Sequence, residues 1–349
     1  PDFFGDRADG FSAGIATCAG SAVFNAVIIP GLCVLAVLFL GVKGPGNTRT
    51  KVDRITLDKK VVIKDGVFFV GAELALIYFL GDSTVVWWMG GALVVIYLVY
   101  FFVTLRTGFG VDEEEDDDDD DDEDEEDGPG VLGLGWLLDV NGRFFGGKPF
   151  TRNHAWVVLS ISIVYIAAAC AMIAWAVEHS AQALGVQPYF TAVILAAAAT
   201  SVPDTVLSVK DALKGNYDDA VANAVGSNIF DICICLGLPL MLYGLTVGAV
   251  ELTSHGAAAD VQILRWALLG VTAVVLTLFL VGTGVGRIKA VVLFGMYFVW
   301  TAFVVGRGMG AEWTAIDHWF ARNDAPLEAP ADPPAPRPEV LAEARPARD

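Results

Sequence analysis

The sequence predicts an all-α, polytopic membrane protein built as an inverted-repeat helical bundle. Three observations lead to this fold class: the chain is very apolar, it contains eight long apolar segments, and one motif occurs twice. Of the 349 residues 55% are hydrophobic, and the mean hydropathy is +0.56, which is too apolar for a soluble protein of this size. We therefore expect an integral, multi-pass protein of the plasma membrane or an intracellular membrane.

The apolar segments are each long enough to cross a bilayer as a helix, which takes about 20 residues. We place these eight transmembrane helices at 13–40, 61–80, 84–105, 155–177, 188–209, 218–245, 262–281 and 288–306. They divide the chain into a first half (1–105), a central loop (106–153), a second half (154–307) and a tail (308–349). The tail is rich in Pro, Ala and charge, so we expect it to be disordered.

The basic residues alternate between successive connections. The connection at 41–60 carries six Lys and Arg residues, those near 210–214 and 287–289 carry two each, and those near 81–83, 178–187 and 246–261 carry none. The positive-inside rule places the basic connections, and the central loop with them, in the cytoplasm. The first and sixth segments then cross the membrane in opposite directions.

The central loop contains sixteen consecutive acidic residues at 112–127. Removing these charges from the net charge of −19 leaves −3, so the folded part is close to neutral. A block of like charges repels itself and stays extended, which favours a solvated linker. A weak Ca²⁺-attracting or regulatory role is the alternative, although the run lacks the ligand spacing of an EF-hand loop.

Two stretches 206 residues apart are nearly the same. Residues 16–32 read ATCAGSAVFNAVIIPGL and residues 222–238 read ANAVGSNIFDICICLGL. Each carries a polar residue four positions after its Gly-Ser pair, Asn25 in one copy and Asp231 in the other. Because the two copies cross in opposite directions, they form an inverted repeat, which is typical of transporters whose site lies where the halves meet.

The fifth segment contains a helix-breaking run, Ala199-Thr200-Ser201-Val202-Pro203-Asp204. Pro203 has no backbone N–H and leaves the carbonyl of Ala199 without its helical donor. The hydroxyls of Thr200 and Ser201 and the carboxylate of Asp204 add oxygens in the same turn. A Pro kink alone would not explain Asp204, because an ionised Asp at mid-helix costs about 2.5–3.5 kcal/mol. Such oxygens suit a hard cation.

The sixth segment carries Ser227 and Asp231, which are four residues apart and lie on one face of the helix. Gly226 lets another helix approach closely. A second carboxylate beside Asp204 would repel it unless a cation sits between them. We interpret Asn228 as a hydrogen bond between helices rather than as a ligand.

These motifs resemble a known family. The runs ATSVPD (199–204) and GSNIFD (226–231) are similar to the second alpha repeat of the cation/Ca²⁺ exchanger superfamily, and GSAVFN (20–25) is similar to part of the first. The potassium-dependent sodium/calcium exchangers resemble the chain most, except that Ala199 stands where the family usually has Gly. The resemblance implies exchange of Na⁺, with or without K⁺, for Ca²⁺, and cation ligation by Thr200, Ser201, Asp204, Ser227, Asp231, Ser21 and Asn25.

The resemblance also implies a bundle of about ten helices. Subtracting the offset of 206 places the counterpart of the fifth segment near residue −18, before the chain begins. The fourth segment has no counterpart in the first half either. We therefore expect that two helices, with a partner proline-acid motif, precede Pro1 in the intact protein.

The function that we predict is a secondary antiporter working by alternating access. The alternatives are a proton/cation exchanger of the same fold and a non-transporting membrane remnant. We find no nucleophile–base pair and no phosphate-binding glycine loop, so we do not expect an enzyme. The expected partners are Ca²⁺, Na⁺, K⁺ in the potassium-dependent case, and the lipid bilayer, with no cofactor and no nucleic acid; the oligomeric state stays open. Glu73 lies well inside the second segment, where an acid is costly, and is either an ion-path residue or a partner in an interhelical hydrogen bond.

Overall fold

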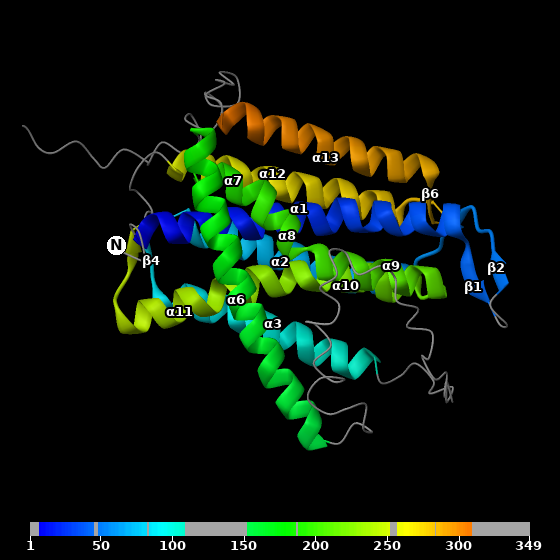
Figure 1. Cartoon of the computed structure of the whole chain (residues 1–349), viewed down its shortest axis with the longest axis horizontal. Helices are drawn as coiled ribbons and strands as arrows, with labels where there is room; N and C mark the ends of the chain where they lie inside the picture. Colours follow the sequence, from blue (N-terminus) through cyan, green and yellow to red (C-terminus); the bar gives the residue numbers. More distant parts are fainter. Residues whose placement is uncertain are drawn as a thin grey trace, which may run out of the picture. The chain divides into compact units, whose positions relative to one another are not determined.

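Helices dominate the computed structural model, which describes residues 7–44, 48–81, 84–108, 152–185, 188–251, 257–282 and 284–308. All of these lie within one structural unit, Pro1–Met309. Figure 1 shows the helices, in which η marks a π-helical stretch: α1 (Arg7–Leu40), α2 (Lys59–Phe79), α3 (Trp87–Gly108), α6 (Arg152–Leu184), α7 (Pro188–Thr191), η3 (Ala192–Ala196), α8 (Ala197–Thr200), α9 (Val202–Lys214), α10 (Tyr217–Phe230), η4 (Asp231–Leu236), α11 (Gly237–Thr246), α12 (Ala257–Leu280) and α13 (Arg287–Gly308).

Every predicted apolar segment coincides with helix in the described part of the chain. The fifth segment consists of α7, η3, α8 and α9, and the sixth consists of α10, η4 and α11. By length and composition, five described helices can cross a membrane, and a sixth can if the pair Ala192–Thr200 and Val202–Lys214, bent by 48°, forms one span. The polytopic helical architecture is therefore confirmed for five or six of the eight predicted spans.

The two remaining segments are α2 and α12. Helix α2 carries Lys64, Asp65 and Glu73 in its interior, and charges in a span are costly, so composition does not establish it as a span. The side chains of α12 are described from Trp266 to Leu280, where the helix is apolar. Both helices pack within the bundle, where α2 contacts α10 and α12.

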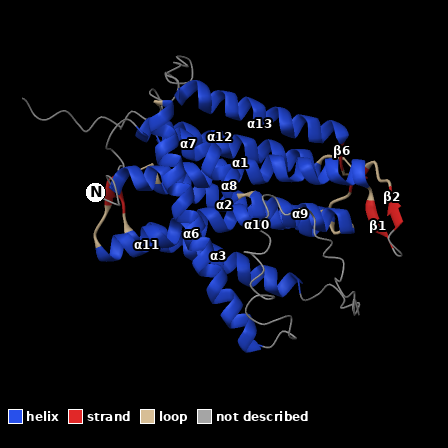
Figure 2. Cartoon of the chain, viewed as in Figure 1, coloured by secondary structure: helices blue, strands red, loops and turns tan. Residues whose placement is uncertain are grey.

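Short antiparallel ribbons join the ends of the helices, and the sequence patterns did not predict them (Figure 2). Strand β1 (Val42–Gly44) pairs with β2 (Thr48–Thr50) in the connection after α1. The other two ribbons link connections that are distant in sequence: β3 (Arg54–Ile55) pairs with β6 (Val285–Gly286), and β4 (Thr84–Val85) pairs with β5 (Val250–Glu251). The loops before α2 and α13 are thereby tied together, as are those before α3 and α12.

Helix α1 forms the centre of the core. It contacts η3, α8, α9, α10, α12 and α13, and its Ala16, Val23 and Cys33 are fully buried. Helix α6 is the opposite case, because its apolar side chains Trp156 and Met172 are 61% and 72% exposed. Exposed apolar side chains along a span suit contact with lipid.

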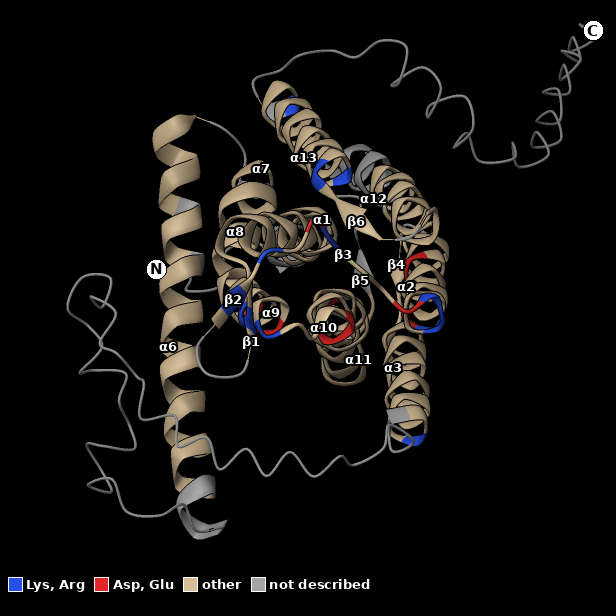
Figure 3. Ribbon diagram, turned by 90° about the vertical axis from the view of Figure 1, so that its right-hand side faces the viewer, with Lys and Arg blue, Asp and Glu red and all other residues tan. Residues whose placement is uncertain are grey.

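Basic residues gather at one end of the bundle. Figure 3 looks at this end, where the connections α1–α2, α9–α10 and α12–α13 lie. The distribution follows the alternation of basic and uncharged connections in the sequence, so we call this the basic end. The acidic run 112–127 and the tail, for which a linker and disorder were predicted, lie outside the described residues.

Candidate cation site

Helix α1 lies directly against the irregular part of the fifth segment because Gly20 has no side chain. A Cβ at Gly20 would lie 2.0 Å from the carbonyl oxygen of Val193 in η3 and 2.8 Å from the Cβ of Ala197 in α8. Only glycine permits this approach. It brings Ser21, the next residue of α1, to the break between α8 and α9.

The hydroxyl of Ser21 joins three segments of the chain. Its Oγ lies 3.1 Å from the Oγ of Ser201 and donates a 2.8 Å hydrogen bond to Oδ2 of Asp231. One turn further along α1, Nδ2 of Asn25 lies 3.4 Å from the same Ser21 Oγ. Ser21, Asn25 and Ser201 are buried, with 4%, 0% and 0% exposure. Oxygens from both copies of the repeated motif thus meet at one point.

Ser201 lies at the break in the fifth segment that Pro203 predicts. The residue belongs to neither α8 nor α9, and the two stretches meet there at 48°. Asp204 lies in the first turn of α9, close enough to the Ser227 hydroxyl of α10 to interact with it. The break thereby places a hydroxyl and a carboxylate toward α1 and α10, respectively.

A partly buried amide, that of Asn223, fixes α9 against α10. Nδ2 of Asn223 donates to the backbone carbonyl of Asp204 at 3.3 Å and to Oγ of Ser208 at 2.9 Å. The sequence analysis did not assign Asn223 to the site. Its position, one helical turn before Ser227, is the signal that could have assigned it to the same face.

Asn228 makes the interhelical hydrogen bond that the sequence predicted. Its Nδ2 donates to the backbone carbonyl of Ala22 in α1 at 3.0 Å, and its side chain is fully buried. Oδ1 of Asn228 and Oδ1 of Asn25 are both buried without a hydrogen-bond partner. The Asn25 oxygen therefore remains available as a ligand beside Ser21.

Thr200 differs from the other predicted ligands. Its hydroxyl donates back to the carbonyls of Ala196 and Ala197, at 3.0 and 3.1 Å, and the residue is exposed. The donated proton leaves its oxygen lone pairs free, but the structure does not bring Thr200 into the hydrogen-bonded group around Ser21.

The electrostatics of the site depend on two carboxylates. Asp204 and Asp231 are close enough to interact electrostatically with each other. Among the described residues, no group of three or more His, Cys, Asp or Glu side chains could hold a metal ion. A bound cation would therefore need the neutral oxygens of Ser21, Ser201 and Asn25 to complete its shell.

Comparisons with known proteins identify the family. The model of the family described as "Sodium/calcium exchanger protein" matches residues 6–106 and 154–306. Sodium/potassium/calcium exchanger 2 of Mus musculus is 33% identical over 154 residues, which is 44% of this chain and 23% of that protein. Sodium/potassium/calcium exchanger Nckx30C of Drosophila melanogaster is 40% identical over 104 residues, 30% of this chain and 12% of that protein.

The matches to these curated relatives span less than a quarter of their length. Among solved structures, the crystal structure of the H⁺/Ca²⁺ exchanger CAX aligns with a TM-score of 0.49 and 13% identity, over 91% of this chain and 78% of its own. A likeness this distant assigns no ion to the present chain. The family model, however, covers both predicted halves and leaves out the central loop and the tail. The chain therefore belongs to the sodium/calcium exchanger protein family, whose members are multi-pass membrane transporters and not enzymes.

Proposed function

We propose that this chain belongs to a secondary antiporter that exchanges Na⁺ for Ca²⁺, with or without K⁺ co-transport. The observation that carries the proposal is the position of Ser21, whose hydroxyl contacts both Ser201 and the Asp231 carboxylate. The exchanged ions are bound by these residues together with Asp204, Ser227, Asn25 and Thr200. This ligand set draws on both copies of the repeated motif.

The chemistry of the site fits competition between the two ions. Na⁺ and Ca²⁺ both accept oxygen ligands, and the two carboxylates of Asp204 and Asp231 can offset the charge of one Ca²⁺ ion. When the site is empty, the two negative charges repel each other in a poorly solvated place. The empty site is therefore high in free energy, so the release of one ion is coupled to the binding of the other.

Alternating access follows from an inverted repeat of the kind that the sequence predicts. By their order along each half, β3 before α2 corresponds to β5 before α12, and β4 before α3 corresponds to β6 before α13. The ribbon β3–β6 then corresponds to β5–β4. In the same way, the contact of α1 with α13 matches that of α11 with α3, and α1 with α12 matches α10 with α2. This pattern supports two inverted halves in which all eight segments span the membrane.

A proton/cation exchanger with the same site is the main competing function. In that case Asp204 and Asp231 would take up protons instead of Na⁺. ⁴⁵Ca²⁺ uptake into proteoliposomes driven by an outward Na⁺ gradient at equal pH on both sides separates the two functions. Uptake that needs a pH gradient and ignores Na⁺ favours proton exchange, and no uptake under either gradient favours a non-transporting remnant.

The variant Asp204→Asn tests the site. We expect it to abolish Na⁺-driven Ca²⁺ uptake, because the divalent ion loses one of two anionic ligands, while insertion is preserved because the helix becomes more apolar. Asp211→Asn is the matched control, since it removes the same charge from the same helix α9 about two turns away. Normal uptake by a well-inserted Asp204→Asn protein contradicts the assignment.

A further inference from the structure

A second buried carboxylate lies outside the site described above. Asp65 of α2 is 1% exposed, and neither of its carboxylate oxygens accepts a hydrogen bond of regular geometry. Its ion-pair partner is Lys64, the preceding residue, whose ammonium lies 3.3 Å from Oδ1 and whose side chain is 24% exposed. Because a buried charge normally has several polar partners, this carboxylate is under-coordinated.

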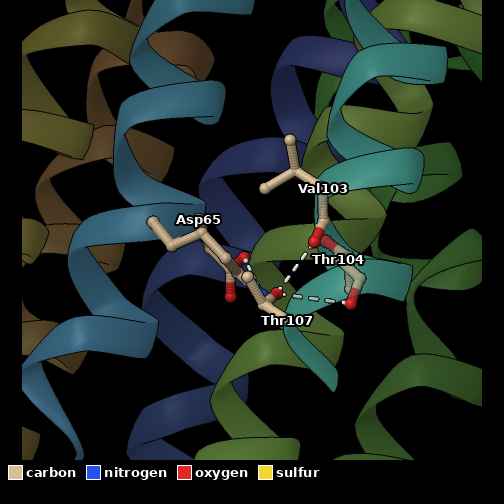
Figure 4. A network of polar contacts seen from close by, with 5 residues as sticks. Asp65, Val103, Thr104 and Thr107 are labelled. Atoms are coloured by element: carbon tan, nitrogen blue, oxygen red, sulfur yellow. Dashed lines mark hydrogen bonds and ion pairs between the residues drawn. The ribbon is translucent and has the colours of Figure 1, made fainter. Parts of the chain in front are cut away.

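Polar side chains of α3 lie beside the Asp65 carboxylate, and Figure 4 shows Thr104 and Thr107 among them. The phenol group of Tyr100 interacts with the carboxylate electrostatically and is its hydrogen-bonding neighbour, as it is of Thr104. The hydroxyl oxygen of Thr104 is buried and also has no hydrogen-bond partner of regular geometry. One turn further, the hydroxyl of Thr107 is occupied, since it donates to the carbonyls of Val103 and Thr104 at 2.9 and 3.3 Å. The unsatisfied acceptors thus belong to Asp65 and Thr104.

These residues lie between the basic end and the proposed exchange site. Helices α2 and α10 both begin at this end and α3 ends there, so a rise of about 1.5 Å per residue gives their depths. Thr104 lies about 6 Å from the end of its helix, Asp65 about 9 Å, Tyr100 about 12 Å and Ser227 about 15 Å. Gly226, the residue before Ser227, lies next to this group, because a Cβ at Gly226 would lie 3.3 Å from the Tyr100 hydroxyl.

We propose that Asp65, Thr104 and Tyr100 form a second cation site, specific for a monovalent inorganic cation. One carboxylate balances one positive charge, and the surrounding ligands are hydroxyl oxygens, which suit Na⁺ and K⁺. The Lys64 ammonium, a tethered monovalent cation on a flexible stem, occupies the site when no ion is bound and moves toward solvent when one arrives. Cation binding at Asp65 does not depend on the proposed exchange function. A role for this site on the path of the exchanged ions does rest on that proposed function.

A stability measurement tests the binding directly. In purified protein carrying Asp204→Asn and Asp231→Asn, which removes the exchange site, the melting temperature is measured against NaCl and against KCl. N-methylglucamine chloride keeps the ionic strength constant. A ligand that binds the folded state raises its stability in a saturable way, so we expect saturable stabilisation by NaCl, KCl or both, and the more effective salt identifies the ion.

Variants assign the stabilisation to Asp65. We expect Asp65→Asn to raise the half-saturating salt concentration by about tenfold or more, as for the loss of one charged ligand. Lys64→Gln should lower it by about threefold, because it removes the tethered competitor, whose side chain is partly exposed. Asp219→Asn and Lys60→Gln remove the same charges from exposed positions at the same end, and we expect neither to change it.

Thr104→Val provides a second test that keeps the shape of the side chain. It removes the unpaired hydroxyl and should weaken the ion-specific stabilisation even if Asp65→Asn does not fold. Saturable stabilisation that is unchanged in Asp65→Asn and in Thr104→Val overturns the proposal. If Asp65→Asn lowers the melting temperature equally in NaCl, KCl and N-methylglucamine chloride, the proposal is also overturned. Asp65 would then only support helix packing.

The two proposals can fail separately. If Asp204→Asn leaves Ca²⁺ uptake normal while the salt effect still depends on Asp65, the exchange site is wrong and the second cation site stands. If Asp204→Asn abolishes uptake but no salt effect depends on Asp65, the exchange function stands and the second site is wrong.

Discussion

At the scale of residues, the repeated motif predicted which side chains would meet but not how they would pair. Ser21 and Asp231 come from different copies and form a 2.8 Å hydrogen bond, as expected for a site between the halves. The family resemblance placed Ser201 in the same ligand set as Ser21, but it did not predict the direct contact between their hydroxyls. A pairing between helices depends on their crossing angle and rotation, which the spacing of residues within one helix does not determine.

Thr200 and Glu73 illustrate the same limit. A Thr in a helix can turn its hydroxyl to its own backbone or to a neighbour, and here Thr200 donates to Ala196 and Ala197. Glu73 accepts a 2.7 Å hydrogen bond from Thr272 of α12. This contact confirms the interhelical alternative for Glu73, and only the packing of α2 on α12 could reveal it.

Asp231 carries the prediction for potassium dependence. Its twin Asn25 is neutral, so the two halves differ in charge at this matched position, and K⁺ needs an additional negative group to offset its dehydration. We expect Asp231→Asn to retain weakened Na⁺-driven Ca²⁺ uptake that no longer responds to K⁺. The measurement is ⁴⁵Ca²⁺ flux with and without external K⁺ in wild type and variant; a wild type that ignores K⁺ contradicts this role.

At the scale of elements, hydropathy located the helices because apolar length is the dominant requirement of a span. It did not predict the π-helical turns η3 and η4, which interrupt the fifth and sixth segments next to the candidate site. Such turns arise where a neighbouring element intrudes on the regular ladder of hydrogen bonds, and they are frequent at functional sites. Here η3 is the stretch against which Gly20 packs, and η4 begins at Asp231.

The contact between α1 and η3 predicts the effect of a single methyl group. Gly20→Ala would place a Cβ 2.0 Å from the Val193 carbonyl, so the two segments must separate, and we expect a loss of about 1–3 kcal/mol in stability. Gly14→Ala is the matched control on the same helix, because its Cβ would meet nothing within 4 Å. It should be neutral or stabilising by up to about 1 kcal/mol.

Thermal unfolding of the two variants in detergent checks this prediction. Equal melting temperatures for Gly20→Ala and Gly14→Ala would mean that the close approach of α1 to η3 is not required.

At the scale of the whole molecule, the family match and the sequence agree on two helical regions flanking a central loop. The family model stops at residue 106 and resumes at 154, close to the predicted loop of 106–153. What the sequence could not predict is the tying of the halves by β3–β6 and β4–β5. Strands of two residues have no detectable periodicity, and their partners lie more than 160 positions away.

The acidic run at 112–127 is expected to be dispensable for basal exchange. It falls within the part of the chain that the family model does not match, and its dense charge favours a solvated linker. Deleting it should leave Na⁺-driven Ca²⁺ uptake close to that of the intact chain in proteoliposomes. A deletion protein that reaches the membrane but does not transport would instead favour the regulatory alternative.

The hydrogen bond between Asn228 and Ala22 has a consequence for the energy balance of the two halves. The two residues are 206 positions apart, so each occupies the other's place in the repeat, and α1 meets α10 at equivalent points. Ala22 has no amide with which to return the bond. In the proposed alternating access, two identical halves would give inward-open and outward-open forms of equal energy. A bond made in only one of the two forms would separate them by about 1 kcal/mol and make one form about five times more populated than the other. Divergence at a single duplicated position would then be enough to give such a carrier a preferred resting form.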